Sequence, residues 1–329
     1  MTGLGLLGLG DLDWALAARP GELVGVDDEQ WARLAAARAD GAHDADFAGA
    51  WANGLAFLQA DEGLRGRPPR RVEWKGPDRL PGGFDSVPAD LRVDHVWLIS
   101  CKYLSKILTN PSPRHLFDRA LGAVDGPVDG GGDWYEQVAP RQYAELYAGL
   151  RAELAAEHPG LPARIADLDR SHRDILKRAF ERRWPDSVAE VSASFTKTVA
   201  TESAIRWGKA LGDLRSREAM LWRLLRMSSA PYFVLGTAAG GRSFRLRIAT
   251  PWDWRQAFTL NAFEVWAEPA GQPKVVWQAS VADRSTGRDR TVSGHVEVRW
   301  SHGRFSGHPE AKVYLDTPHD EVPGYVPLA

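Results

Sequence analysis

The chain has almost no cysteine and no long apolar run, and both absences narrow the class of protein. Its 329 residues include one cysteine, Cys101, so neither an internal disulfide framework nor a cysteine-based zinc site can form. No stretch approaches the roughly eighteen consecutive apolar residues of a membrane span. The first residues also lack the basic region of a secretory signal. We therefore expect a cytoplasmic protein that does not associate with membranes.

Several catalytic motifs are missing as well. The sequence has no Gly-x-Ser-x-Gly elbow, no Walker-type phosphate loop and no His-Glu-x-x-His zinc motif. Gly3 to Gly8 does match Gly-x-Gly-x-x-Gly, but the dinucleotide fingerprint requires a strand before the first glycine. Only two residues precede Gly3, so we interpret this match as coincidence.

The overall composition is that of a globular protein, whereas the charge is unevenly distributed. Hydrophobic residues make up 44% of the chain, charged residues 26%, and the net charge is −2. Residues 1–63 hold eleven acids against three arginines, whereas residues 161–226 hold fourteen basic residues against nine acids. Four arginines crowd into residues 65–71. The basic stretches 65–71 and 161–226 could bind the phosphates of a nucleic-acid backbone. Alternatively, they could be solvated surfaces of mixed charge.

The hydrophobic periodicity predicts three regions and a mixed α+β fold class. Residues 1–125 combine helices over Asp27–Arg38 and Asp44–Gln59 with short strands, and residues 126–229 show the three- and four-residue spacing of helices. Residues 230–329 alternate with period two between turn-forming glycines, which predicts an antiparallel β region. The first one or two strands of that region could return to complete a sheet formed by residues 1–125.

The stretch from Pro88 to Tyr103 contains the most informative polar residues. Pro88-Ala89-Asp90 precedes an apolar strand pattern that is interrupted by Asp94-His95 and continues to Ser100-Cys101-Lys102. We expect two short antiparallel strands, or one strand with a bulge. Ser100 and Lys102 are two residues apart and therefore share a strand face, and a lysine in a dry strand requires a partner. Asp90 and Asp94 are the nearest candidates.

This pattern resembles the PD-(D/E)xK nuclease superfamily, which has the restriction-endonuclease-like fold. That family places an Asp at the end of one strand and an acid-x-Lys on the neighbouring strand. Asp90 and Lys102 match these positions, while Ser100 stands where the second acid is usual. The resemblance covers about Asp61 to Leu121. It implies a restriction-endonuclease-like core, interrupted by a helical insertion and followed by the antiparallel β region.

The resemblance also implies roles for individual residues. A hard divalent cation, Mg²⁺ or Mn²⁺, would be held by Asp90 with a further acid, either Glu62 or Glu73. Lys102 would stabilise the developing negative charge, and the catalytic set would be Asp90, Lys102, Ser100 and Asp94. Separately from the resemblance, the charge distribution makes Arg65, Arg67, Arg70 and Arg71 the candidate residues for contact with nucleic acid.

These residues favour a metal-dependent DNA endonuclease of restriction or phage-defence type, acting on DNA and possible as a homodimer. One alternative is a non-catalytic nucleic-acid-binding or interaction protein on a degenerate nuclease scaffold, because Ser100 replaces an acid. Another is a structural or assembly protein, in which Asp90 caps a turn and Lys102 protects an edge strand from aggregation.

Overall fold

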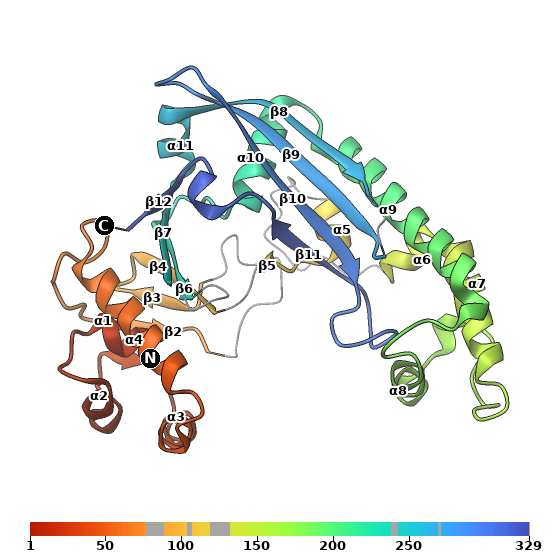
Figure 1. Cartoon of the computed structure of the whole chain (residues 1–329), viewed down its shortest axis with the longest axis horizontal. Helices are drawn as coiled ribbons and strands as arrows, with labels where there is room; N and C mark the ends of the chain where they lie inside the picture. The colour runs from red at the N-terminus through yellow and green to blue at the C-terminus, as the bar shows by residue number, and fades with distance from the viewer. Residues whose placement is uncertain (77–88, 104–106, 119–131, 238–242, 269–270, 329) are drawn as a thin grey trace.

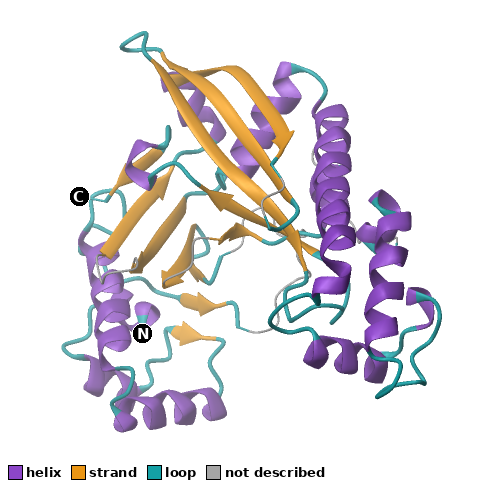
Figure 2. Cartoon of the chain, turned by 45° about the vertical axis from the view of Figure 1, so that its right-hand side comes forward, coloured by secondary structure: helices purple, strands orange, loops and turns teal. Residues whose placement is uncertain are grey.

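The computed structural model describes residues 1–76, 89–103, 107–118, 132–237, 243–268 and 271–328. Two β-sheets and a set of helices make up this part of the chain, which confirms the mixed α+β class (Figures 1 and 2). Among the described residues, none of the helices has the length and apolar character needed to cross a bilayer.

The first sheet is mixed and has seven strands in the order β1-β2-β3-β4-β6-β7-β12. From β2 to β4 the strands form an antiparallel meander, after which β6 pairs parallel to β4 and β7 pairs antiparallel to β6. The strands β6 and β7 therefore join a sheet begun by residues more than 100 positions earlier. The bounds are β1 (Leu23–Val24), β2 (Val72–Trp74), β3 (Leu91–Val93), β4 (Trp97–Tyr103), β6 (Tyr232–Thr237), β7 (Ser243–Ile248) and β12 (Tyr325–Pro327).

Helices α1 (Thr2–Leu6) and α4 (Asp44–Gln59) pack on one face of this sheet (Figure 1). They touch at glycines: a Cβ added to Gly5 would fall 2.3 Å from the carbonyl oxygen of Trp51, and one at Gly54 would fall 2.3 Å from that of Thr2. The glycine-rich start of the chain thus lies in a helix whose close contact with α4 requires Gly5. Two further N-terminal helices, α2 (Leu12–Ala18) and α3 (Asp28–Asp40), complete this end of the molecule.

The second sheet is antiparallel, with the order β5-β11-β10-β9-β8. Its buried face, which includes Phe263 and Trp277, packs against the long helix α9 through Trp207. In Figure 2 this helix runs beside the long strands of the sheet. The bounds are β5 (Ile107–Thr109), β8 (Phe258–Ala267), β9 (Lys274–Asp283), β10 (Asp289–Arg299) and β11 (Glu310–Leu315).

One large core joins the helical region to the second sheet and to the far side of the first sheet. It extends in sequence from Leu108 to Tyr325, so the predicted boundary at 229/230 does not separate two cores. The remaining helices are α5 (Pro113–Phe117), α6 (Trp134–Val138), α7 (Pro140–Glu153), α8 (Arg170–Ala179), α9 (Ala189–Leu211), α10 (Leu214–Leu224) and α11 (Pro251–Ala257), with 3-10 turns at Ile165–Asp167, Asp186–Val188 and His319–Glu321.

Candidate functional site

The predicted pair of short strands is a tight hairpin formed by β3 and β4. Its two turn residues, Asp94 and His95, both have positive φ, at 47° and 61°. The amide of Val96 donates to the carbonyl of Val93 over 3.0 Å, which closes the two-residue turn. This is the type I′ geometry whose twist matches that of antiparallel strands. The turn fixes the register, with Leu91 opposite Ile99.

This register places the candidate catalytic residues on one face of the sheet. Leu91, Val93 and Ile99 are buried against the layer of α1 and α4. Because side chains alternate along a strand, Asp90, Ser100 and Lys102 point to the opposite face. Lys102 lies opposite Gly236 of β6, where a Cβ would fall 1.9 Å from the carbonyl oxygen of Lys102. Only glycine permits this close pairing of β6 beside Lys102.

Asp90 is held by β4 through two hydrogen bonds to the same oxygen. Its Oδ2 accepts from the amide of Cys101 over 2.7 Å and from the hydroxyl of Ser100 over 3.2 Å. The Ser100 side chain is buried, at 1% exposure, whereas Lys102 is half-buried. The structure therefore brings Asp90 and Ser100 into direct contact and places Lys102 on the same face, one alternation further along β4.

Arg226, to which no sequence motif points, extends this cluster as a further polar residue. Its side chain is 4% exposed, and Nη1 donates to the hydroxyl of Tyr232 over 2.8 Å and to that of Ser100 over 3.4 Å. Burial raises the pKa of Tyr232, although the nearby Arg226 charge opposes that shift. Asp90, Ser100, Tyr232 and Arg226 thus form one polar network, in which Asp90 is half-buried and the other three are buried. Its acid can compensate its buried cation.

The backbone at Arg226 has a conformation that glycine usually adopts. After α10, the amide of Met227 bonds to the carbonyl of Trp222 and that of Arg226 to the carbonyl of Arg223, a Schellman cap. Arg226 occupies the left-handed position of this cap, with φ of 60°, where glycine is usual. Arg226 therefore adopts a backbone conformation in which a side chain is strained, and its guanidinium is directed into the cluster.

Cys101 points away from the cluster, as its alternation with Lys102 predicts. Burial, followed by the nearby Asp90 charge, raises the pKa of its thiol to about 11. A thiol with this pKa is protonated at neutral pH and is a poor nucleophile. Cys101 is therefore part of the packing beneath the site.

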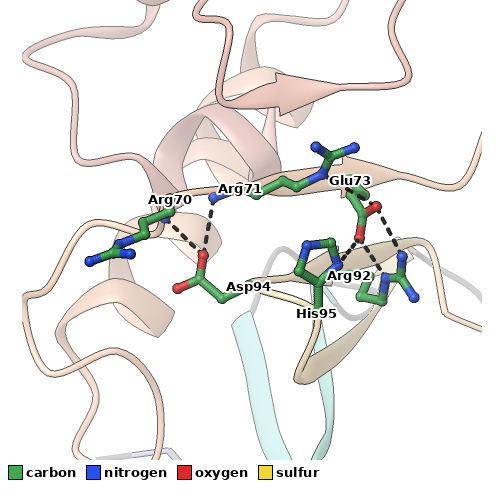
Figure 3. A network of polar contacts seen from close by, with 6 residues as sticks. All are labelled: Arg70, Arg71, Glu73, Arg92, Asp94 and His95. Atoms are coloured by element: carbon green, nitrogen blue, oxygen red, sulfur yellow. Dashed lines mark hydrogen bonds and ion pairs between the residues drawn. The ribbon is translucent and has the colours of Figure 1, made fainter.

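Asp94 has a structural position at the tip of the hairpin, shown in Figure 3. Its Oδ1 accepts from the amides of Arg70 and Arg71 over 2.8 and 3.0 Å, and Oδ2 accepts from Arg67 Nη2 over 3.1 Å. Asp94 therefore anchors the basic segment 67–71 to the turn. The structure does not place it among the hydrogen-bond partners of Ser100.

Glu73 is likewise engaged away from Asp90. Arg92 binds its two carboxylate oxygens over 2.5 and 2.9 Å, with Arg71 and His95 each 3.4 Å from one of them (Figure 3). The hydrogen bond from Arg92 is the main reason that the pKa of Glu73 falls to about 2. A metal ion at Glu73 would have to displace this bidentate pair.

Glu62 lies on the other side of the sheet from Asp90. It lines a cavity of about 560 Å³ together with Arg65, Arg67, Trp97 and Arg247. The ring of Trp97 packs on the same core as Ile99, the face opposite Ser100 and Lys102. Within the described ranges, no three His, Cys, Asp or Glu side chains gather in an arrangement that could hold a metal ion. Asp90, Glu62 and Glu73 together therefore do not form such a group within these ranges.

Asp90 and Ser100 nevertheless carry oxygen atoms of the kind that Mg²⁺ prefers as ligands. Mg²⁺ commonly binds one or two protein carboxylates and completes its shell with water and substrate phosphate oxygens. Asp90 supplies a carboxylate and Ser100 a hydroxyl, both hard oxygen ligands, next to each other. These two residues would hold the cation only together with a phosphate-bearing substrate.

Two of the four basic residues predicted to contact nucleic acid are paired with acids. Arg67 pairs with Asp94 and Arg71 with Glu73, while Arg65 Nε donates to the carbonyl of Asp61 over 2.7 Å. The Arg67 side chain is nevertheless 54% exposed, so it can reorient toward a ligand.

When the chain is compared with protein-family models, curated proteins and solved structures, none of them matches it.

Proposed function

We propose that this chain is a metal-dependent DNA endonuclease whose reactive pair is Asp90 and Lys102. The observation that carries the proposal is their common face on two paired strands, with Ser100 bonded to Asp90 between them. The order of elements supports it: a helix precedes the antiparallel strands, helices follow the lysine strand, and β6 returns parallel to that strand. This order agrees with a restriction-endonuclease-like core.

The residues divide the work of phosphodiester hydrolysis. Asp90 and Ser100 would hold a divalent cation, which would lower the pKa of a bound water and neutralise the phosphate. Lys102 brings a positive charge to the same face, where it stabilises the charge that develops in the transition state. Arg226 holds the hydroxyls of Ser100 and Tyr232 and so keeps the Asp90–Ser100 pair in place.

Cleavage assays test this proposal. Wild type, Asp90→Asn and Lys102→Ala are incubated with duplex and single-stranded DNA in Mg²⁺ or Mn²⁺, beside the exposed-site controls Asp40→Asn and Lys209→Ala. We expect cleavage by the wild type and both controls, and a loss of about a hundredfold or more in each site variant. Equal cleavage by all five proteins, or no cleavage by the wild type with either cation, would rule out the proposed endonuclease activity.

A second function is favoured by Ser100 and Arg226. A neutral hydroxyl occupies the position of the second acid, and a buried cation lies behind it, so the network contains one carboxylate and one guanidinium. On this reading the chain binds nucleic acid on a degenerate nuclease scaffold without cutting it. DNA binding that weakens steeply with salt and is unaffected by EDTA, together with no cleavage, identifies this function.

A further inference from the structure

The cavity on the far side of the sheet from Asp90 combines the groups that bind a nucleobase. About 560 Å³ in volume, it falls in the usual range for small-molecule sites. An aromatic ring, Trp97, lies in its wall beside the guanidinium-bearing Arg65, Arg67 and Arg247. Aromatic rings and arginine planes are the groups on which unpaired bases stack, while arginine also binds phosphate.

The carboxyl group of Glu62 in the same wall has unused capacity as an acceptor. Its Oε2 is shielded from water and has no hydrogen-bond partner in the described part of the chain. A buried acceptor left in this state costs free energy that a donor from a bound ligand would recover. Neighbouring groups are already engaged: Arg247 pairs with Asp253 over 2.7 Å and Arg65 with the carbonyl of Asp61. Glu62 therefore marks where an occupant should present N–H groups.

The position of Arg67 over Trp97 is suited to a planar occupant. The guanidinium carbon lies 5.9 Å from the ring centroid of Trp97. Two stacked contacts need about 7 Å, so a small outward movement of this half-exposed side chain would admit a base between them. Its pairing with Asp94 holds the arginine at the cavity mouth in the meantime.

We infer that this cavity binds a single unpaired guanine of DNA, stacked on Trp97 with its ring and amino N–H groups donating to Glu62. Among the bases, guanine presents two adjacent donors on its pairing edge, which match the two oxygens of a carboxyl group. The inference rests on the proposed function only in taking DNA as the ligand class. It reassigns Glu62 from a metal ligand to a residue that determines base preference.

Calorimetric titration in EDTA tests the site without any contribution from cleavage. The probes are GMP, IMP, which lacks the 2-amino group, and UMP, followed by a thymidine decamer with or without one central guanine. We expect GMP to bind about tenfold more tightly than IMP, and the guanine-containing decamer to exceed the plain decamer by a similar factor. Equal affinities for GMP and IMP, or binding of free GMP without any preference among the decamers, would overturn the inference.

Variants then assign the effect to the cavity. Glu62→Gln should abolish the difference between GMP and IMP, while the matched control Glu29→Gln, an exposed carboxyl on α3, should keep it. Trp97→Leu should weaken all nucleotides about tenfold. If Glu62→Gln retains the preference for GMP over IMP, the assignment of the guanine contacts to Glu62 is wrong. Because EDTA removes divalent cations, a chain that cannot cleave DNA can still show the preference for guanine. The titration therefore tests the cavity separately from the proposed endonuclease activity.

Discussion

The two ends of the short strand β3 each carry an acid with arginine nearby, yet the two clusters have opposite characters. At the base of the hairpin, half-buried Asp90 joins the buried Ser100 and Arg226 in a polar network. At the tip, Asp94 holds the half-exposed arginines of residues 67–71. At the base, burial of the Arg226 guanidinium costs free energy. The stability of the fold alone does not require a buried charge there. The tip forms surface pairs that fix a turn, so under the proposed function the base is the end that would carry the catalytic step.

The largest expected effect comes from removing the buried cation at the base. Arg226→Ala deletes two hydrogen bonds, leaves the Tyr232 hydroxyl without this donor and retains a non-glycine residue at φ of 60°. We expect a loss of about 2–4 kcal/mol in the free energy of unfolding, measured by urea denaturation. Arg226→Gly removes the same side chain but suits the left-handed backbone, so it should be about 1 kcal/mol less damaging. If Ala and Gly cost the same, the cap geometry has no energetic weight.

The next effect concerns the tip. Asp94→Ala removes three hydrogen bonds that anchor residues 67–71 and places an alanine at φ of 47°. We expect about 1–2 kcal/mol of destabilisation, again by urea denaturation. Asp94→Gly should recover the backbone part of this loss. Cleavage by Asp94→Gly should stay near that of the wild type, and a catalytic loss as large as that of Asp90→Asn would show that the two ends are not separate.

The local part of the hairpin could be predicted from the sequence, whereas the nonlocal part of the network could not. Asp94-His95 between β-branched and aromatic residues is a local turn signal, and alternation within β4 predicts that Ser100 and Lys102 share a face. Arg226 reaches Ser100 across 126 positions, through the packing of α10 and the parallel pairing of β6. Neither the packing of α10 nor the parallel pairing of β6 produces a periodic pattern in the sequence.

The two candidate third acids show the same limit. Glu62 and Glu73 both lie close to Asp90 along the chain, and sequence distance alone could not choose between them. The choice depends on sheet faces and partners: Glu62 lines the cavity near Trp97, and Glu73 pairs with Arg92 of the neighbouring strand. A cross-strand ion pair of this kind is fixed only when the register is known.

A smaller effect depends on pH and belongs to the tip. The Arg92 pairing lowers the pKa of Glu73 from its usual 4.5 to about 2. A depressed folded-state pKa gives stability that is present above pH 4.5 and is lost as the pH falls toward 2. We expect the free energy of unfolding of the wild type to exceed that of Glu73→Gln by at most about 1 kcal/mol at pH 6. This difference should vanish near pH 2. Urea midpoints across this range measure it, and a difference that grows on acidification would contradict the assignment.

The smallest effect on stability is expected at Lys102, which sharpens the contrast between folding and function at the base. Lys102→Met keeps the length and the apolar stem of the side chain while removing the ammonium group. Because methionine keeps the packing of the stem and only the charge is lost, we expect the free energy of unfolding to fall by less than about 1 kcal/mol. Cleavage should nevertheless fall by about a hundredfold. A Lys102→Met protein that unfolds much more easily than wild type would instead make this lysine a structural partner within the polar network, because a residue acting on a substrate phosphate has no such effect on the folded chain.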